Sequence, residues 1–396
     1  MMTISSPQYV WTFFTGPFQT TTHAALSDVQ WTITILIVLQ TWLSPFQGWL
    51  VDRFGPKLLI GAGAVMSGLG WVASAQAASL WQLYATYGLL CGVGTGIVYI
   101  GVVGLMVRWF PNRRGLATGV VAAGYGFGAI LTTFPIDSMM KTSGYQSTLV
   151  TFGLIFAVVG LAAALFLRAP RDEEATPSAV GAATASAGYT PSQMLRTPVF
   201  WLMFLMMSMM STGGLMVITQ FKAFAKSFGI TDTTTVLILG ISLAAIPTAL
   251  TFDRITNGLT RPFFGWVSDK IGRENTMALA FILEGFAIWL MIVYRADPFL
   301  FVLLSGLVFF GWGEIFSLFP STLTDTFGTT HATTNYGFLY MAQGVGSILG
   351  APVAAMIFES TGSWMPVFSL IIGMDILTGL LALFALKPMR RALMDG

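Results

Sequence analysis

Apolar residues fill most of the chain in runs of about 20 residues, which are separated by short polar stretches rich in glycine, proline and charge. A helix of roughly that length crosses the ~30 Å hydrocarbon core of a bilayer, whereas a membrane barrel uses strands of only about 10 residues. The pattern therefore predicts an all-α membrane protein with twelve transmembrane helices. Their expected ranges are 1–18, 28–50, 58–77, 80–108, 115–138, 145–168, 197–225, 234–266, 275–295, 298–318, 333–358 and 365–387.

A single long polar segment divides these spans into an N-terminal six-helix half, 1–168, and a C-terminal six-helix half, 197–390. The segment 169–196 is rich in alanine, serine and proline and has the composition of a linker. Its acidic run, Asp172–Glu174, is interpreted as a solvated face. The first span is short for a transmembrane helix, so we expect residue 1 to lie inside a longer helix.

An internal repeat supports the division into two related halves. The segment GWLVDRFG at 48–55 recurs as GWVSDKIG at 265–272, and every matched position is displaced by 217 residues. Each copy ends the second helix of its half. Parallel repeats of this kind place the substrate site of a transporter at the interface of the halves, near the membrane midplane. A fold with two pseudo-symmetric six-helix halves is therefore predicted.

Composition agrees with a membrane location. Only 9% of the residues are charged, 55% are hydrophobic and the mean hydropathy is +0.75, whereas soluble domains carry about 25% charged residues. The net charge of +2 gives no indication of a nucleic-acid partner. Cys91, His23 and His331 lie apart, so we expect no disulfide, metal or cofactor. The sequence also lacks a catalytic triad or phosphate loop, which argues against an enzyme and against ATP-driven transport.

The basic residues are distributed unevenly between the two sets of loops. The loops after even-numbered helices and the C-terminal tail hold 13 Lys and Arg residues, against 4 in the loops after odd-numbered helices. Since cytoplasmic loops carry the excess of positive charge, both termini and the linker are expected in the cytoplasm.

Charged residues inside spans are costly and indicate function. Arg261 lies eight residues before Asp269, roughly 12 Å along the helix and thus close to the midplane. Its planar guanidinium matches a carboxylate. The alternative is a buried ion pair with Asp253 or Glu314. The other charges within spans are Arg254, interpreted as the partner of Asp253 or as an entry charge, and Glu284 and Asp375, interpreted as interhelical contacts.

The same estimate of depth selects companions for Arg261. Tyr99, Tyr125 and Gln343 lie eight to ten residues inside the cytoplasmic ends of their helices. Phenol hydroxyls donate hydrogen bonds to carboxylate oxygens, and aromatic rings exclude water. The arrangement favours a small planar anion surrounded by aromatic side chains. Glu314 is assigned equally to proton coupling or to neutralising an arginine, and Asp253 is a second candidate for proton coupling.

Several longer motifs resemble known transporters. The two copies of G-x-x-x-D-[RK]-x-G resemble the signature of the major facilitator superfamily, and the chain as a whole resembles its oxalate:formate antiporter family, adjacent to the monocarboxylate transporters. The motifs that carry this resemblance are YVWTFF from Tyr9, VDRFGPK from Val51, GTGIVY ending at Tyr99, RWFPNRRGLATGVVAAGYGFG from Arg108, NGLTRPFFGWVSDKIGR from Asn257, LFPSTLTDTFG from Leu318 and NYGF from Asn335.

The resemblance implies roles for individual residues. The arginine of the RPF motif, Arg261, is implied to bind the substrate carboxylate. Tyr9, Trp11, Gln30 and Trp312 fall where family members present aromatic or polar groups to the cavity, although each could equally be packing. The motif residues implied in gating are Gly48, Asp52, Arg53, Gly265, Asp269 and Lys270. Gln343 departs from the well-known exchangers, which carry a lysine here, and this disfavours a dianion.

The sequence therefore predicts a monomeric multi-pass carboxylate transporter of a bacterial inner membrane, which resembles oxalate:formate antiporters and works by alternating access. A proton-coupled monocarboxylate symporter, with Glu314 or Asp253 carrying the proton, is the alternative in mechanism. A multidrug exporter would favour an acidic cavity, and a nutrient sensor would carry an added signalling domain.

Overall fold

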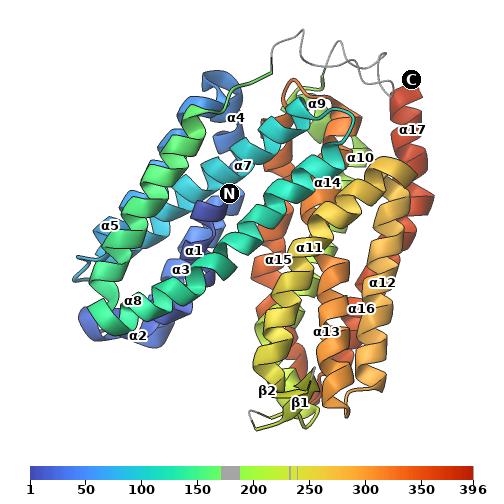
Figure 1. Cartoon of the computed structure of the whole chain (residues 1–396). Helices are drawn as coiled ribbons and strands as arrows, with labels where there is room; N and C mark the ends of the chain where they lie inside the picture. Colours follow the sequence, from blue (N-terminus) through green and yellow to red (C-terminus); the bar gives the residue numbers. More distant parts are fainter. Residues whose placement is uncertain (171–187, 232, 239, 396) are drawn as a thin grey trace. The chain divides into compact units, whose positions relative to one another are not determined.

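The computed structural model describes residues 1–170, 188–231, 233–238 and 240–395 (Figure 1). The central part of the expected linker, 171–187 with its acidic run Asp172–Glu174, lies outside the described residues. Helices account for most of the rest. The first ten are η1 Met2–Ile4, α1 Ser6–Tyr9, α2 Trp11–Thr22, α3 Leu26–Trp42, α4 Ser44–Phe54, α5 Pro56–Ser74, α6 Leu80–Leu83, the π-helix η2 Tyr84–Leu90, α7 Cys91–Trp109 and α8 Arg114–Leu165.

The second half begins with a short helix, and a hairpin lies between its first two long helices. The elements in chain order are α9 Pro191–Leu195, α10 Pro198–Ser227, β1 Thr235–Ile238, β2 Ile241–Ala244, α11 Ala245–Ile271, α12 Arg273–Val293, α13 Pro298–Trp312, α14 Ile315–Phe327, α15 Ala332–Thr361, α16 Met365–Leu381, the π-helix η3 Ala382–Leu386 and α17 Lys387–Asp395.

Several of the predicted spans are bent or divided. In α8, Gly144 has a φ of 77°, which ends one helix and starts another, so α8 supplies the two spans predicted at 115–138 and 145–168. The second span is divided between α3 and α4, which meet at an angle of 52°. The first is interrupted at Val10, between α1 and α2. Breaks in membrane helices are tolerated where neighbouring groups satisfy the freed backbone.

Among the described residues, eight helices are long and apolar enough to cross a membrane, or nine when α3 and α4 count as one span. The division of α8 adds another. The remaining two spans are α1 with α2, which are short, and α11, whose charged residues lower its hydropathy. Twelve spans result, in agreement with the sequence pattern.

The expected span 234–266 is wrong at its start. Residues 235–244 form an antiparallel hairpin in which Thr235 pairs with Ala244 and Ile238 with Ile241. Gly240, with a φ of 81°, lies in its turn, and Thr, Val and Ile are residues that favour strands. The helix α11 begins only at Ala245. Hydropathy alone does not distinguish an apolar strand from the end of an apolar helix.

The chain divides into two compact units, which are described separately. Unit 1 contains 1–111, 124–192 and 327–341, and unit 2 contains 112–123, 193–326 and 342–396. The first turns of α8 thus belong to unit 2, and the first turns of α15 belong to unit 1. Each six-helix stretch of sequence contributes one short segment to the unit that is built mainly from the other stretch.

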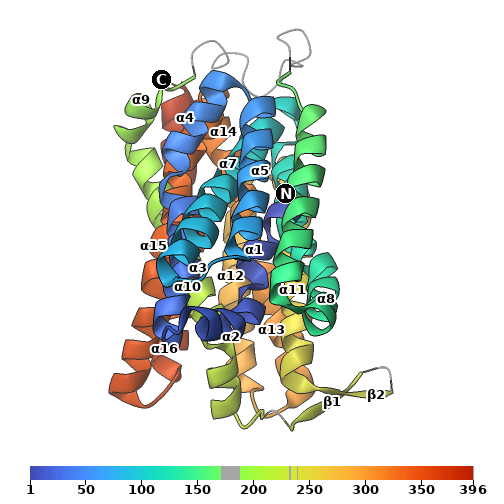
Figure 2. The same ribbon diagram turned by 90° about the vertical axis from the view of Figure 1, so that its left-hand side faces the viewer.

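The internal repeat is also visible in how helices pack within each unit. In unit 1, α7 packs against α5 and against the broken span formed by α3 and α4. In unit 2, α13 packs in the same way against α11 and against α12. Figures 1 and 2 show α11, α12 and α13 running alongside one another. The helix that follows each copy of the motif, α5 in unit 1 and α12 in unit 2, therefore packs against the next long helix of its own unit in the same way.

Candidate functional site

Arg261 lies in the middle of α11 in unit 2 and is only 3% exposed. Its guanidinium donates hydrogen bonds to the carbonyl oxygen of Ala122, at 2.7 Å, and to Oδ1 of Asn257, at 2.9 Å. Its Cζ lies 4.6 Å from the ring centroid of Phe316. Asn257 is one helical turn earlier on α11, so helix geometry positions it against the arginine.

Within the described chain, Arg261 forms no ion pair at 4.0 Å or less. The alternative of a buried ion pair with Asp253 or Glu314 is therefore not what the structure shows, although Glu314 is near enough to interact electrostatically with Arg261. Nε of Arg261 also has no hydrogen-bond partner among the described residues. A buried guanidinium without an ion-pair partner is costly, and a bound carboxylate can balance its positive charge.

Asp253 lies two turns earlier on α11 and is buried, whereas Arg254 is exposed. The two interact electrostatically, but they are not among the ion pairs of the described part of the chain. Their side chains leave the helix about 100° apart, so the expected close partnership is weak.

A close helix contact brings Ala122 to Arg261. The first turns of α8 pass so near α11 that a Cβ on Gly119 would collide with the carbonyl group of Arg261. Only glycine permits that approach. The sequence did not indicate roles for Gly119 and Ala122, since their contact with Arg261 depends on the crossing of two helices far apart in the chain.

Trp312 and Gln343 are two further candidates in unit 2. Trp312 is 5% exposed, and its Nε1 donates a hydrogen bond to the carbonyl oxygen of Met210 at 2.9 Å. Its indole fills the space beside Gly214. Gln343 is half-buried on α15, and its Oε1 accepts no hydrogen bond from a described residue. Trp312 is thus a packed side chain, while Gln343 keeps hydrogen-bonding capacity.

The candidate tyrosines form a cluster in unit 1. Tyr125 lies edge-on to Tyr9 and Tyr99, with ring centroids 5.8 and 5.5 Å away. Tyr99 also stacks on Tyr340 at 4.8 Å. The Tyr125 hydroxyl donates to Oε1 of Gln8 at 2.8 Å. Tyrosines from four helices, α1, α7, α8 and α15, thus meet in one aromatic group.

Gln40 and Tyr340, which also belong to this cluster, were not predicted from the sequence. Gln40 donates a hydrogen bond from Nε2 to the Tyr340 hydroxyl at 3.2 Å, and both side chains are buried. Tyr340 lies in the part of α15 that belongs to unit 1, three residues before Gln343. The NYGF motif pointed to this helix, but nothing in the sequence indicated which face Tyr340 occupies.

Trp11 and Gln30 contact each other in unit 1. Nε1 of Trp11 donates to Oε1 of Gln30 at 2.9 Å. The indole is 3% exposed and lies in an apolar core with Phe18 and Tyr87. Packing therefore accounts for Trp11.

The first copy of the motif joins α4 to the start of α15. Asp52 accepts hydrogen bonds at Oδ2 from the backbone N–H and the hydroxyl of Thr334, at 2.9 and 2.6 Å, and its Oδ1 pairs with Arg108. Gly48 permits this contact, because a Cβ there would lie 2.6 Å from the carbonyl oxygen of Thr333. A carboxylate at a helix N-terminus is favoured by the unsatisfied N–H groups and the helix dipole.

The second copy does the same for the start of α8. Asp269 accepts hydrogen bonds from the backbone N–H groups of Gly115 and Leu116, at 3.0 and 2.9 Å. Gly265 lies against Gly115, and a Cβ at either position would collide with the other residue's backbone. In each unit, one aspartate therefore caps a helix that starts after a loop far away in the sequence.

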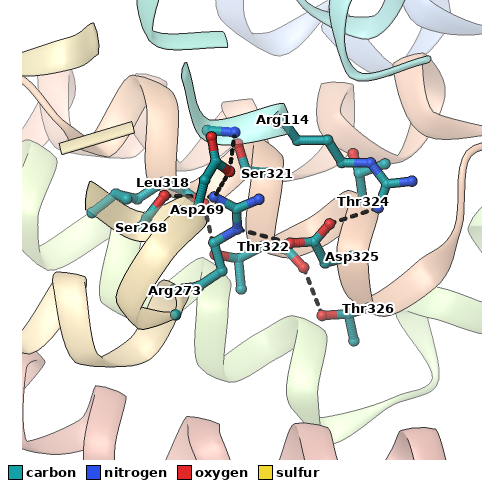
Figure 3. Close-up of polar contacts among 12 residues, drawn as sticks. Arg114, Ser268, Asp269, Arg273, Leu318, Ser321, Thr322, Thr324, Asp325 and Thr326 are labelled. Atoms are coloured by element: carbon teal, nitrogen blue, oxygen red, sulfur yellow. Dashed lines mark hydrogen bonds and ion pairs between the residues drawn. The ribbon is translucent and has the colours of Figure 1, made fainter. Parts of the chain in front are cut away.

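A chain of charges extends this second site (Figure 3). Arg273 bridges two carboxylates, with Nη1 2.6 Å from Oδ1 of Asp269 and Nε 2.7 Å from Oδ2 of Asp325. Arg114 pairs with the other oxygen of Asp325 at 2.6 Å. The 217-residue displacement relates Asp325 to Arg108, so an acid replaces a base at this position of the repeat, and Arg273 supplies the missing positive charge.

The basic residues of the motif do not join these networks. Arg53 is exposed and its Cζ lies 5.2 Å from the ring of Trp49. Nζ of Lys270 lies 3.9 Å from the ring of Trp266. Such cation–π contacts suit side chains at a membrane interface. Among the described residues, no group of three or more His, Cys, Asp or Glu side chains is placed to hold a metal ion.

Comparison with known proteins identifies the family. The sequence profile of the Major Facilitator Superfamily matches residues 2–256 and 236–393. An oxalate:formate antiporter of Oxalobacter formigenes is 33% identical over 99% of this chain and 90% of its own length. Human monocarboxylate transporter 11 is 25% identical over 89% of this chain and 73% of its own length.

Solved structures show the same fold at low sequence identity. A proton:xylose symporter superposes with a TM-score of 0.71 at 14% identity, covering 97% of this chain and 93% of that chain. The fucose:proton symporter of Escherichia coli gives a TM-score of 0.70, also at 14% identity, over 97% of this chain and 96% of that one. The chain is therefore a multi-pass membrane transporter that belongs to the major facilitator superfamily and, within it, to the oxalate:formate antiporter family.

Proposed function

We propose that this transporter carries small carboxylate anions by alternating access and that Arg261 binds the carboxylate group. The observation that carries the proposal is a buried guanidinium with no ion-pair partner among the described residues. Its remaining contacts are neutral, to a carbonyl, an amide and an aromatic ring. A bound carboxylate supplies the missing negative charge in a geometry that suits the planar fork.

The names of the relatives agree with this substrate class. One is an oxalate:formate antiporter and another a monocarboxylate transporter. A multidrug exporter fits less well, because an apolar cation has no reason to enter a site whose buried charge is positive. We also propose that the protein is a monomer in a bacterial inner membrane. The uneven distribution of Lys and Arg favours an orientation with both termini and the linker in the cytoplasm.

The tyrosine cluster of unit 1 is a second candidate for contact with substrate. It holds hydroxyl and amide donors without formal charge, and a substrate oxygen would replace Gln8 as the acceptor for Tyr125 or Tyr340 as the acceptor for Gln40. Tyr125→Phe removes one donor, which costs about 1–3 kcal/mol if its partner stays buried and unpaired. We expect this variant to weaken substrate affinity without abolishing transport.

Counterflow in proteoliposomes tests the proposal. Labelled oxalate, formate, lactate and pyruvate are offered to vesicles loaded with the same unlabelled anion. Arg261→Lys keeps the charge but loses the bidentate fork, so we expect it to abolish exchange. Arg295→Lys, at an exposed position beyond the end of α12, is the matched control and should retain exchange. Near-normal exchange by Arg261→Lys, or no counterflow with any of the four anions, would contradict the proposal.

A further inference from the structure

Three acidic side chains of unit 2 are completely buried. Glu284 lies on α12, Asp375 on α16, and Glu314 at the break between α13 and α14, and each is 0% exposed. Glu284 is roughly 16 Å along its helix and Asp375 roughly 15 Å along its own. Both therefore lie near the middle of helices that span the membrane, far from either end.

The three carboxyl groups are neighbours. Glu284 interacts electrostatically with Asp375 and with Glu314, and Glu314 interacts with Asp375 and with Arg261. The helices that carry them pack directly on one another, α12 against both α13 and α16. The residues on either side of Glu314 pack beside Arg261: an ideal Cβ on Gly313 would lie 2.7 Å from the carbonyl oxygen of Asn257, and Phe316 lies against the guanidinium of Arg261. Glu314 is therefore close to the candidate anion-binding arginine as well as to the other two acids.

Glycines on neighbouring helices pack closely against the acidic residues. A Cβ on Gly311 would lie 2.6 Å from Cβ of Glu284, and one on Gly285 would lie 3.3 Å from Cβ of Asp375. Gly213 of α10 faces Oδ1 of Asp375, at 3.6 Å from its own ideal Cβ position. Glu284 and Asp375 are therefore packed against neighbouring helices at positions where the facing residue has no side chain, and Asp375 has a carboxyl oxygen next to one of these glycines.

The decisive feature is the absence of donors. None of the six carboxyl oxygens of Glu284, Glu314 and Asp375 has a hydrogen-bond partner among the described residues. Ionised carboxylates are very costly to bury without donors or counter-ions. The three acids are not arranged to hold a metal ion in the described part of the chain. Protons are the ligand that relieves the cost.

The charged groups on the surrounding helices do not change this balance. On α11 the neighbour is Arg261, and one positive charge balances one carboxylate at most. On α12, Arg273 and Glu274 lie at the helix start and pair with Asp269 and Asp325 and with Arg390. Asp253 and Arg254 lie two turns before Arg261 on the same helix, and Arg254 is exposed. The other charged side chains lie near helix ends: Lys222 and Lys226 on α10, Lys270 on α11, Asp325 on α14 and Glu359 on α15.

We infer that Glu284, Glu314 and Asp375 form a proton-binding cluster and that Glu314 takes up a proton when a carboxylate binds Arg261. A substrate anion and an ionised Glu314 compete for the same guanidinium charge. When the anion takes it, Glu314 loses its counter-ion and the neutral form becomes favoured. When the anion leaves, Glu314 regains the cation and releases the proton to solvent. Proton and carboxylate thus bind together, which is the linkage of a symporter.

This inference rests on the proposed function, and the next measurements separate the two. Carboxylate binding to the purified protein in weakly buffered solution is followed with a pH-sensitive dye, using formate, oxalate and pyruvate. We expect proton uptake with the wild type and its loss in Glu314→Gln. The matched control is Glu359→Gln, at an exposed acid near the end of α15, which should behave as the wild type. Binding without proton uptake in the wild type overturns the inference and leaves the proposed function standing.

Transport supplies a second comparison. An inward proton gradient should drive accumulation of labelled pyruvate by the wild type, and Glu314→Gln should lose this drive while retaining counterflow. Gradient-driven accumulation by Glu314→Gln that equals the wild type overturns the inference. Failure of counterflow with every carboxylate contradicts the proposed function instead.

A chemical probe tests the cluster even if a variant does not fold. Dicyclohexylcarbodiimide reacts with protonated carboxyl groups in apolar surroundings. In the wild-type protein in lipid nanodiscs, peptide mass spectrometry should find the modification at Glu284, Glu314 or Asp375, reduced at alkaline pH, and not at Glu359. Absence of modification at all three acids at mildly acidic pH overturns the inference.

Discussion

Thr334 donates two hydrogen bonds to one carboxylate oxygen of Asp52, although the two residues are 282 positions apart in the chain. The backbone N–H and the hydroxyl both reach Oδ2, while Arg108 occupies Oδ1. Because Thr334 lies in the first turn of α15, the carboxylate caps that helix as well as accepting the side-chain bond. The end of α4 and the start of α15 are therefore held together in this conformation.

Thr334→Val tests this contact. The variant retains the backbone bond and loses the hydroxyl bond, which as a bond to a charged group is worth about 1.5–3 kcal/mol. We expect the conformation held by the contact to be less populated and substrate exchange to slow by roughly tenfold. Equilibrium substrate affinity should be unchanged, and Asp52→Asn should act in the same direction.

Thr248→Val, on the first turn of α11, is the control, because its hydroxyl bonds the carbonyl oxygen of Ala244 in the preceding turn. Exchange rates and binding constants are measured on the same preparations. A variant at Asp52 or Thr334 that loses equilibrium binding at normal expression would show that these residues do more than hold the conformation.

Arg273→Lys should destabilise unit 2. Arg273 uses two different nitrogens to bridge Asp269 and Asp325, and a lysine cannot reproduce that geometry. Since breaking a buried charge pair typically costs about 3–5 kcal/mol, we expect a clear fall in the melting temperature in detergent. Arg53→Lys, at the exposed cation–π contact with Trp49, makes the same substitution as a control. Equal melting temperatures for the two variants would contradict this role for Arg273.

Gly265→Ala should disturb the crossing of α8 and α11. A methyl group there would collide with the backbone carbonyl of Gly115, and backbone cannot move aside as a flexible side chain does. Overpacking of this kind costs about 1–3 kcal/mol, so thermal stability and exchange rate should both decrease. Gly373→Ala, on α16, has no atom within 4 Å of the new methyl group and should be neutral or slightly stabilising. A neutral Gly265→Ala would mean that the two helices separate readily.

The orientation in the membrane follows from charge alone and is tested with a reporter. The 13-to-4 distribution of Lys and Arg between the two sets of loops predicts a cytoplasmic C-terminus. Alkaline phosphatase fused after the last residue should therefore be inactive, and green fluorescent protein in the same place should fluoresce. An active phosphatase fusion would reverse the assigned orientation.

The helices were predictable because their apolar runs are long and the membrane permits few alternatives. The repeat at 48–55 and 265–272 was also predictable, since its two copies share identical or similar residues at a constant displacement of 217 positions. The hairpin at 235–244 was missed because a short apolar run has the same hydropathy in a strand as in a helix. The division of the span 298–318 at Gly313 and Glu314 was also missed, since apolar residues flank the break on both sides and a single glycine is tolerated inside a helix.

The candidate site was predictable in its charges and less so in its contacts. Arg261 stands out because an arginine within a span is rare. Its partners Ala122 and Phe316 have no chemistry that marks them, and they reach Arg261 only through tertiary packing. The same is true of Arg273, which lies outside the repeated motif yet carries the ion pairs that Lys270, inside it, does not make.

Gln343→Lys is expected to change which anions are accepted. Arg261 is the one cation that we assign to substrate, so one bound negative charge is balanced and a second is not. An unpaired charge in a buried site costs several kcal/mol, and about 1.4 kcal/mol is a tenfold change in affinity. The wild type should therefore prefer monocarboxylates. The side-chain oxygen of Gln343 has no hydrogen-bond partner in the described chain. A lysine at this position would therefore break no hydrogen bond to that oxygen and would add a positive charge.

Competition measures this preference directly. Unlabelled oxalate and formate compete with a labelled substrate at constant pH, in the wild type, in Gln343→Lys and in Gln343→Met, which changes the side chain without adding charge. We expect the ratio of oxalate to formate affinity to rise in Gln343→Lys and to remain near the wild-type value in Gln343→Met. If the wild type already binds oxalate more tightly than formate, and Gln343→Lys leaves the ratio unchanged, a second cation must already act on the substrate. Arg254, seven residues before Arg261 and on a similar face of α11, would then be the residue to substitute.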